Sequence, residues 1–292
     1  MPPSVRHVAL PALWMLVASA LFAAQAGLVK SALVTLGAVE LAFFRGLFAA
    51  AAALAYLGLR GMPLRTPQLR AQIALGVVGW ASLVCYFIAL GLVPLGTATA
   101  LNYTAPIFLT VFAAVLAVHR PRPLAVAGVL LGLAGVWVLL SPSLAGQRWA
   151  GMSIGLFSGV SGGLAYLLLS RLGAAGEPPW RTSLYFSAVG CALGGAVVLA
   201  RSGFSISNWH EVALVAAIGG LATLAQVAMA AAYSFGVPVI PATFSYAAVV
   251  FSSLLGAWYW GERLSATAWG GIALVIVSGV MVSAQRSGAA KA

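Results

Sequence analysis

Apolar runs of about twenty residues recur along the whole chain, and they constrain its fold more than any motif does. Each run is long enough to cross roughly 30 Å of hydrocarbon as an α-helix. Apolar residues make up 62% of the chain and charged residues 7%, whereas about a quarter of a soluble domain is charged. The connections between the runs are too short to hold a soluble domain. The sequence therefore predicts an all-α, multi-pass membrane protein.

Loop signals divide these runs into ten expected transmembrane helices. The first run is interpreted as an uncleaved span rather than a signal peptide, because its apolar core is too long for a typical signal. The expected spans cover residues 8–29, 38–59, 71–91, 95–118, 123–141, 151–171, 181–200, 211–234, 239–260 and 265–284.

The net charge of +11 indicates orientation rather than nucleic-acid binding. The basic residues are scattered in loops, with no continuous basic stretch for a phosphate backbone to follow. Ten of them lie in segments on the side of the termini and four on the other side. An excess of Lys and Arg marks the cytoplasmic side, so both termini are expected in the cytoplasm.

The segments Leu116–Ser141 and Tyr259–Ala284 have the same organisation, 143 positions apart. Each is the end of an apolar helix, a short loop with an arginine (Arg120 or Arg263), and a second apolar helix. A unit of five helices that begins inside ends outside, so its repeat crosses the membrane in the opposite sense. The chain is therefore expected to contain two inverted five-helix repeats, residues 8–141 and 151–284, with Pro106 producing a kink in one span.

Two segments resemble a known family. "VELAFFRGLFAAAAAL" (Val39–Leu54) and "WGERLSATAWGGIALVIVSGV" (Trp260–Val280) are similar to the ten-helix, EamA-type branch of the drug/metabolite transporter superfamily. The first-half loop departs from the pattern, with His119 and Arg120 at the positions of Glu262 and Arg263. The resemblance implies transport of small metabolites, often amino-acid export, across a bacterial inner membrane.

Few charged residues fall inside the expected spans, where burial is costly without a partner or a function. Arg45 is expected to brace the bundle by pairing with Glu40 or with backbone carbonyls, or to line the cavity and attract a carboxylate. Lys30, Glu262 and Arg263 are expected to be interfacial anchors that reach water at span ends. The spans carry no carboxylate near the middle of the membrane, which disfavours proton coupling through a buried acid.

The sequence gives no indication of an enzyme. Its three histidines lie at span ends or in loops, and no histidine or carboxylate pair shares a helix face. Metal-assisted or acid–base chemistry therefore has no assembled site. No metal or cofactor is expected.

A substrate site is expected among polar and aromatic side chains at the centre of the bundle, on the spans that line the cavity in the resembling family. The alternatives are that single Tyr and Trp residues lie at the headgroup level and that Ser and Thr bond to their own helix. Asn102–Tyr103 and Ser245–Tyr246 occupy equivalent repeat positions and are expected to face each other. The candidate residues are Trp14, Gln25, Trp80, Tyr86, Thr99, Asn102, Tyr103, Ser158, Ser161, Tyr166, Gln226, Ser245 and Tyr246.

The expected function is a secondary transporter that exports small neutral or zwitterionic metabolites by alternating access. Amino acids, aromatic or bulky and apolar, are the expected substrates. The alternative is a channel-like facilitator or a non-transporting membrane scaffold. The expected partners are a small-molecule substrate and the lipid bilayer, with no nucleic acid, and a monomer is compatible with the sequence.

Overall fold

The chain is all-helical in the part that the structure describes. The computed structural model describes residues 5–61, 64–116, 123–140, 149–201, 203–235 and 239–289, and these contain helices, turns and connecting segments but no strand. The loop with His119 and Arg120, and the repeat boundary at residue 141, lie outside the described residues.

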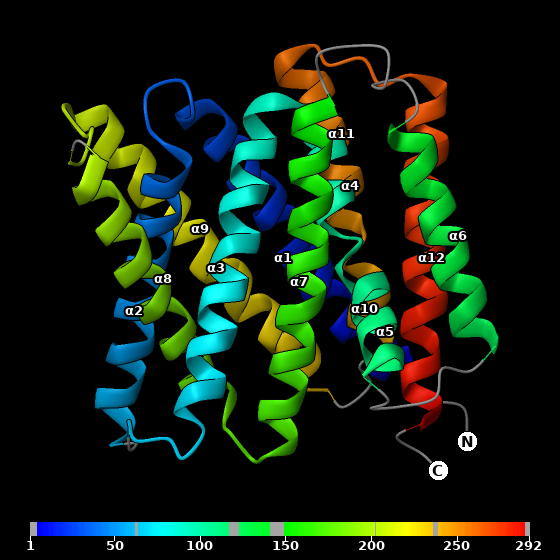
Figure 1. The fold of residues 1–292 in the computed structure, drawn as a ribbon, viewed down its shortest axis with the longest axis horizontal. Helices are drawn as coiled ribbons and strands as arrows, with labels where there is room; N and C mark the ends of the chain where they lie inside the picture. The colour runs from blue at the N-terminus through cyan, green and yellow to red at the C-terminus, as the bar shows by residue number, and fades with distance from the viewer. Residues whose placement is uncertain are drawn as a thin grey trace.

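The helices form a bundle in which α1 begins, and α12 ends, at the same end (Figure 1). In chain order they are α1 (Val5–Ala32), α2 (Ala38–Arg60), α3 (Leu69–Leu92), α4 (Leu95–Asn102), α5 (Ala105–Val115), α6 (Pro123–Leu140), α7 (Trp149–Ala174), α8 (Pro179–Arg201), α9 (Trp209–Tyr233), α10 (Val239–Phe244), α11 (Ala247–Trp260) and α12 (Ala266–Ala289).

The bundle has the surface of a membrane protein. Within the described residues, seven helical segments are long and apolar enough to cross a bilayer, and three shorter apolar helices accompany them. Large apolar side chains such as Leu59, Leu199 and Trp258 are more than two-thirds exposed. A soluble protein rarely exposes so much contiguous apolar surface, so these side chains contact lipid.

Two expected spans are interrupted rather than continuous, which corrects the prediction of single helices over 95–118 and 239–260. The first is divided at Tyr103 and Thr104 into α4 and α5, and the second at Ser245 and Tyr246 into α10 and α11. Pro106 accounts for the first break, because it lacks an N–H and its ring would clash with the carbonyl of Asn102 in a continuous helix. The predicted kink near Pro106 is confirmed, and it lies where α4 ends and α5 begins.

The second break has a different cause, because the proline nearest to it along the described chain, Pro241, lies within α10. At this break the Ser19 hydroxyl of α1 donates to the carbonyls of Phe244 and Ser245, at 3.3 and 3.4 Å. These contacts satisfy carbonyls near the end of α10 from outside their own helix. The side chain of a distant helix therefore supports this interruption.

Helices from the two halves of the chain pack against each other throughout the bundle. α1 packs against α9 and α11, and α7 packs against α3 and α5. α2 lies against α8, α6 against α12, and α4 against α11. The largest buried apolar cluster draws residues from both halves, including Phe87 and Ile272. These contacts bring the two interrupted helices to the interior of the fold.

Candidate functional site

The two helix interruptions meet at a pair of tyrosines. The rings of Tyr103 and Tyr246 lie edge to face, with centroids 5.9 Å apart. Tyr246 is only 2% exposed, and its hydroxyl has no hydrogen-bond partner among the described residues. A buried hydroxyl without a partner is uncommon because its desolvation is not compensated. The junction therefore offers an unused polar group in an apolar interior.

Further tyrosines surround this pair. Tyr86 of α3, Tyr166 of α7 and Tyr233 of α9 are close enough to Tyr103 to influence it electrostatically. Tyr166, which is about half exposed, marks the accessible edge of the group. We call these residues, with Tyr103 and Tyr246, the tyrosine cluster. Aromatic faces with hydroxyl groups at their edges suit a small amphipathic molecule.

The first interruption is held by α7. The Asn102 amide donates to the Ser158 hydroxyl at 3.2 Å, and that hydroxyl donates to the Gly155 carbonyl at 2.6 Å. Small residues allow this close contact: a Cβ atom at Gly159 would lie 2.5 Å from the Leu101 carbonyl oxygen, and one at Gly163 would lie 2.8 Å from that of Ala105. The glycine-rich stretch of α7 therefore positions the break.

A second polar contact links the tyrosine cluster to α4. The Tyr86 hydroxyl and the Thr99 hydroxyl are 3.0 Å apart, and Thr99 donates to the Leu95 carbonyl at 2.8 Å. This contact fixes the Tyr86 hydroxyl beside the first interruption.

The remaining candidates are distributed less tightly. Gln25 is buried in α1, and Gln226 of α9 is partly buried. The Ser161 hydroxyl donates back to the Phe157 carbonyl of its own helix at 2.8 Å. Trp14 is 42% exposed and Trp80 lines a pocket beside α2. Among the candidates, the structure thus brings Tyr86, Thr99, Asn102, Tyr103, Ser158, Tyr166, Ser245 and Tyr246 into one region.

The charges at the span ends are paired, which corrects the prediction that Lys30 and Glu262 separately reach water. The Lys30 ammonium and the Glu262 carboxylate are 2.7 Å apart, and both side chains are largely buried. The other Glu262 oxygen accepts from the Leu95 N–H at the start of α4 at 2.8 Å, and Lys30 donates to the Val93 carbonyl at 2.9 Å. We call this the Lys30–Glu262 latch. Arg263, by contrast, is exposed.

The expected pairing of Arg45 with Glu40 is wrong. The Glu40 carboxylate accepts from the Ser205 backbone N–H at 2.8 Å, beyond the end of α8. Arg45 makes no ion pair within the described residues, and its Nε atom is buried without a hydrogen-bond partner. Arg45 instead lines a small pocket, in agreement with the alternative that places it at a cavity wall.

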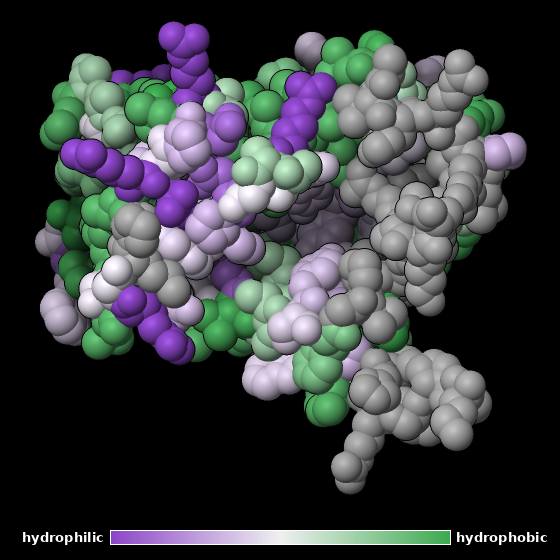
Figure 2. Space-filling model, turned by 90° about the horizontal axis from the view of Figure 1, so that it is seen from below, coloured by the Kyte–Doolittle hydropathy of each residue, from purple (hydrophilic) through white to green (hydrophobic). Residues whose placement is uncertain are grey.

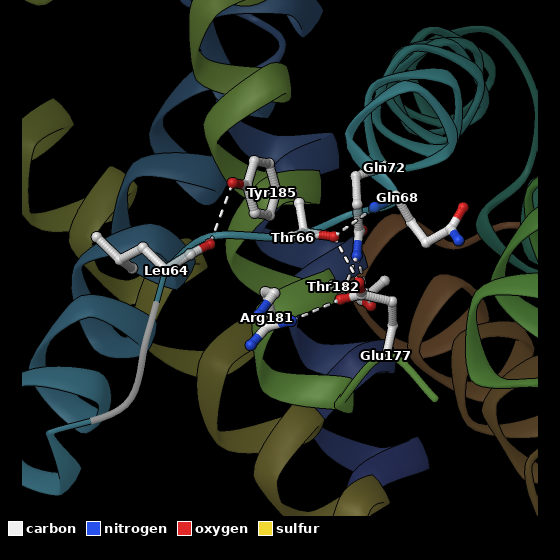
Figure 3. Close-up of polar contacts among 8 residues, drawn as sticks. All are labelled: Leu64, Thr66, Gln68, Gln72, Glu177, Arg181, Thr182 and Tyr185. Carbon is white, nitrogen blue, oxygen red and sulfur yellow. Dashed lines mark hydrogen bonds and ion pairs between the residues drawn. The ribbon is translucent and has the colours of Figure 1, made fainter. Parts of the chain in front are cut away.

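A buried carboxylate network that the sequence did not reveal joins α3 to α8 (Figure 3). Glu177, 7% exposed, accepts from the Thr66 hydroxyl at 2.5 Å and from the Gln72 amide at 3.3 Å, and Arg181 lies 3.2 Å from it. Nothing local marks Glu177, since it follows a Gly-containing turn between two helices. The nearby Pro178–Pro179 pair signals a helix start but not the contact with α3.

The two ends of the bundle differ in access. α4 packs against α11 at the end with the Lys30–Glu262 latch, and a Cβ atom at Gly96 would lie 2.9 Å from the Cα atom of Ser253. α5 and α10 make no comparably extensive contact in the described chain. Figure 2 shows a hollow near the middle of the face seen from below, the end where α1 begins and α12 ends.

This geometry can be compared with known proteins. The model of the EamA-like transporter family matches residues 9–141. The pseudopaline exporter CntI of Pseudomonas aeruginosa (strain UCBPP-PA14) is 31% identical over 275 residues, covering 93% of this chain and 95% of the exporter. The chain belongs to the EamA-like transporter family. It is therefore a membrane transporter and not an enzyme.

More distant relatives agree with this membership. A riboflavin transporter of Rhizobium johnstonii is 25% identical over 209 residues, covering 72% of this chain and 66% of the relative. A solved crystal structure superimposes with a TM-score of 0.63 at 24% identity and covers 97% of this chain and 99% of its own. That likeness establishes the fold alone. As in its relatives, the substrate of this EamA-like transporter is a small molecule.

Proposed function

We propose that the chain is a bacterial inner-membrane carrier that exports small neutral or zwitterionic metabolites, amino acids with aromatic or bulky apolar side chains in particular, by alternating access. It has ten transmembrane helices in two inverted five-helix repeats, residues 8–141 and 151–284, with both termini in the cytoplasm. The substrate binds at the tyrosine cluster. The observation that carries this proposal is the meeting of two interrupted helices at Tyr103 and Tyr246.

Interrupted helices at the centre of a bundle are typical of carriers built from repeats. Tyr103 and Tyr246 are 143 positions apart, the same offset as the two loop-and-helix segments of the sequence. The packing supports the same symmetry, because α1 contacts α9 and α11 where α7 contacts α3 and α5. The family match over residues 9–141 coincides with the proposed first repeat.

Alternating access explains why the two ends of the bundle are packed differently in the described residues. In an inverted repeat, the packing of α4 against α11 at one end has a counterpart between α5 and α10 at the other. The carrier would exchange these two contacts, opening one side as it closes the other. With both termini in the cytoplasm, as proposed, the hollow at that end of the bundle supports an inward-facing state (Figure 2).

Counterflow in proteoliposomes tests the proposal. Vesicles that hold purified protein and unlabelled L-phenylalanine are diluted into trace labelled L-phenylalanine, with L-alanine as a second load. A carrier accumulates label transiently, at least fivefold above protein-free vesicles and more with phenylalanine inside. Equilibration without overshoot would indicate a channel-like facilitator, and no entry of label with any load would leave only a scaffold.

Two variants test whether the tyrosine cluster is the substrate site, with the amount of protein as a check on folding. Asn102→Ala and Tyr246→Ala should lower counterflow at unchanged amounts of protein in the vesicles. Wild-type counterflow in both variants would remove the tyrosine cluster as the substrate site while leaving the carrier proposal intact.

A further inference from the structure

A small pocket lies between α2, α3 and α8, beside the tyrosine cluster. Its polar side chains are Arg45 of α2, Trp80 of α3 and Ser187 of α8, and its remaining lining is apolar or glycine, including Leu83 and Phe186. Close helix contacts form it: a Cβ atom at Gly46 would lie 3.4 Å from the Ser187 carbonyl oxygen, and one at Gly190 would lie 3.4 Å from the Trp80 ring.

The pocket contains two hydrogen-bond donors that have no partner among the described residues. Arg45 Nε and Trp80 Nε1 are both buried and neither has a partner among the described residues. Guanidinium and indole groups donate and cannot accept. No acidic side chain lines the pocket, and the nearby Glu40 carboxylate is bound to the Ser205 N–H. The pocket therefore contains a positive charge and, among its lining residues, no acidic group to balance it.

A guanidinium inside a membrane span is costly to keep without a counter-charge. Arginine remains protonated in proteins, so the charge cannot be removed by loss of a proton. The three other carboxylates that the structure describes are also occupied elsewhere: Glu262 by Lys30, Glu177 by Arg181, and Glu211 by Ser207. A ligand with a negative charge would supply the counter-charge that the described carboxylates do not provide.

We propose that Arg45 and the Trp80 indole N–H bind the carboxylate of the transported substrate. A carboxylate supplies two acceptor oxygens, and a guanidinium can bind both. The pocket is too small for a whole metabolite, so only the end group of a bound molecule would lie against Arg45 and Trp80. A phosphate dianion would leave one negative charge unmatched, because Arg45 is the one cation among the lining residues.

The neighbours of Arg45 connect this pocket to the tyrosine cluster. Arg45 is close enough to Tyr86 for the two side chains to interact electrostatically. Tyr86 in turn contacts Thr99 and is close enough to Tyr103 to influence it electrostatically. A bound molecule would thus have its carboxylate at Arg45 and its apolar part toward Tyr103 and Tyr246. This inference rests on the proposed function and narrows its substrates to molecules with a free carboxylate.

Fluorine NMR tests the binding of a carboxylate without requiring transport. Protein is labelled with 5-fluorotryptophan, and the resonance of Trp80 is identified by its loss in Trp80→Phe. The probes are phenylacetate and phenylacetamide, which share a shape and differ in charge. We expect phenylacetate to shift the Trp80 resonance saturably, with an affinity at least tenfold higher than that of phenylacetamide.

The matched variants are Arg45→Met and Arg60→Met. Both remove an arginine from α2, but Arg60 lies at the exposed end of the helix, away from the pocket. We expect Arg45→Met to abolish the phenylacetate response and Arg60→Met to retain it. Equal responses to the two probes in the wild type, no response to phenylacetate, or a retained response in Arg45→Met would each overturn the proposal. The comparison of probes in the wild type holds even if Arg45→Met does not fold.

The carrier proposal and the carboxylate-site proposal can be overturned independently of each other. Counterflow of phenylalanine with no Trp80 response would overturn the carboxylate site and leave the carrier. A Trp80 response specific to phenylacetate, without phenylalanine counterflow, would overturn amino-acid transport and leave the site.

Discussion

At the scale of single residues, the Tyr246 hydroxyl is the most informative atom of the candidate site. It is buried and has no hydrogen-bond partner in the part of the chain that the structure describes. A buried hydroxyl without a hydrogen bond costs about 1–3 kcal/mol, so a native structure that keeps one has a use for it. We interpret the hydroxyl as a donor or acceptor reserved for substrate.

The change Tyr246→Phe tests this interpretation, because it removes the hydroxyl and keeps the ring packed against Tyr103. Thermal stability should be unchanged or higher, since an uncompensated polar atom is removed. Counterflow should fall about fivefold to tenfold, the effect of one lost hydrogen bond of about 1 kcal/mol or slightly more. Thermal unfolding in detergent and counterflow at matched protein content measure the two effects.

Tyr185→Phe serves as the control for Tyr246→Phe. The Tyr185 hydroxyl donates to the Leu64 carbonyl at 3.1 Å, far along the chain from the interruptions. This variant should lose a little stability and keep its transport. A Tyr246→Phe protein that is less stable than the wild type yet transports normally would show that the hydroxyl has a structural partner.

At the scale of elements, the sequence predicted where helices lie better than where they are interrupted. Apolar length together with loop signals located most helix ends to within a few residues. The break at Ser245 and Tyr246 carries no such signal, because its support comes from Ser19 of α1. Pro106 indicated that the first span is disturbed near this position, but a proline alone does not distinguish a kink from an interruption.

Contacts between elements were predicted least well. Lys30 and Glu262 each look like ordinary span-end charges, and only the fold brings them within 2.7 Å. The offset of the expected repeat did predict that Tyr103 and Tyr246 face each other, and their rings are in contact. Glu177 and Thr66 are not related by the expected repeat, and no pattern in the sequence indicated their contact.

The contact of α7 with the first interruption leads to a prediction at this scale. In Gly159→Ala the new methyl group would lie 2.5 Å from the Leu101 carbonyl oxygen, which belongs to backbone that cannot rotate away. The variant should lower thermal stability by several degrees, as expected for overpacking that costs about 1–3 kcal/mol, and should reduce counterflow.

Gly173→Ala is the matched control on the same helix, because nothing lies within 4 Å of a Cβ atom there. Alanine is favoured over glycine inside a helix by roughly 0.8–1.0 kcal/mol. This variant should be as stable as the wild type or slightly more so, with normal transport. Equal stability of the two variants would mean that α7 does not hold the break tightly.

At the scale of the whole molecule, the arrangement predicts which residues are reached from each side of the membrane. Arg70 at the start of α3 and Thr267 at the start of α12 are both exposed, at opposite ends of the bundle (Figure 1). In a variant with Cys85 and Cys191 replaced by alanine, Arg70→Cys should react with an impermeant maleimide only from the cytoplasm. Thr267→Cys should react only from outside. The reverse pattern would invert the proposed orientation and make the hollow an outward-facing one.

The Lys30–Glu262 latch departs from the symmetry of the proposed inverted repeat. At the repeat offset of 143, Lys30 corresponds to Gly173 and Glu262 to His119, so the sequence has no equivalent ion pair for the opposite end. One closed state is therefore held by an ion pair that the other lacks. This asymmetry favours the state with the hollow on the side of the termini, in which an exporter receives its substrate.

Loss of the latch should shift the carrier toward the opposite state. Ser253 is 2% exposed and packs against Gly96 behind the latch, so a Ser253→Cys reporter should be protected from a maleimide added on the outside. Adding Glu262→Gln should raise its labelling rate about tenfold, which corresponds to about 1.4 kcal/mol of lost preference for the closed outer side. Arg263→Gln, an exposed neighbour in the same loop, should leave the rate unchanged. If the cysteine reporter is labelled no faster with Glu262→Gln than with Arg263→Gln, the ion pair does not set the balance between the two states. In that case the packing of α4 against α11 alone keeps the outer side closed.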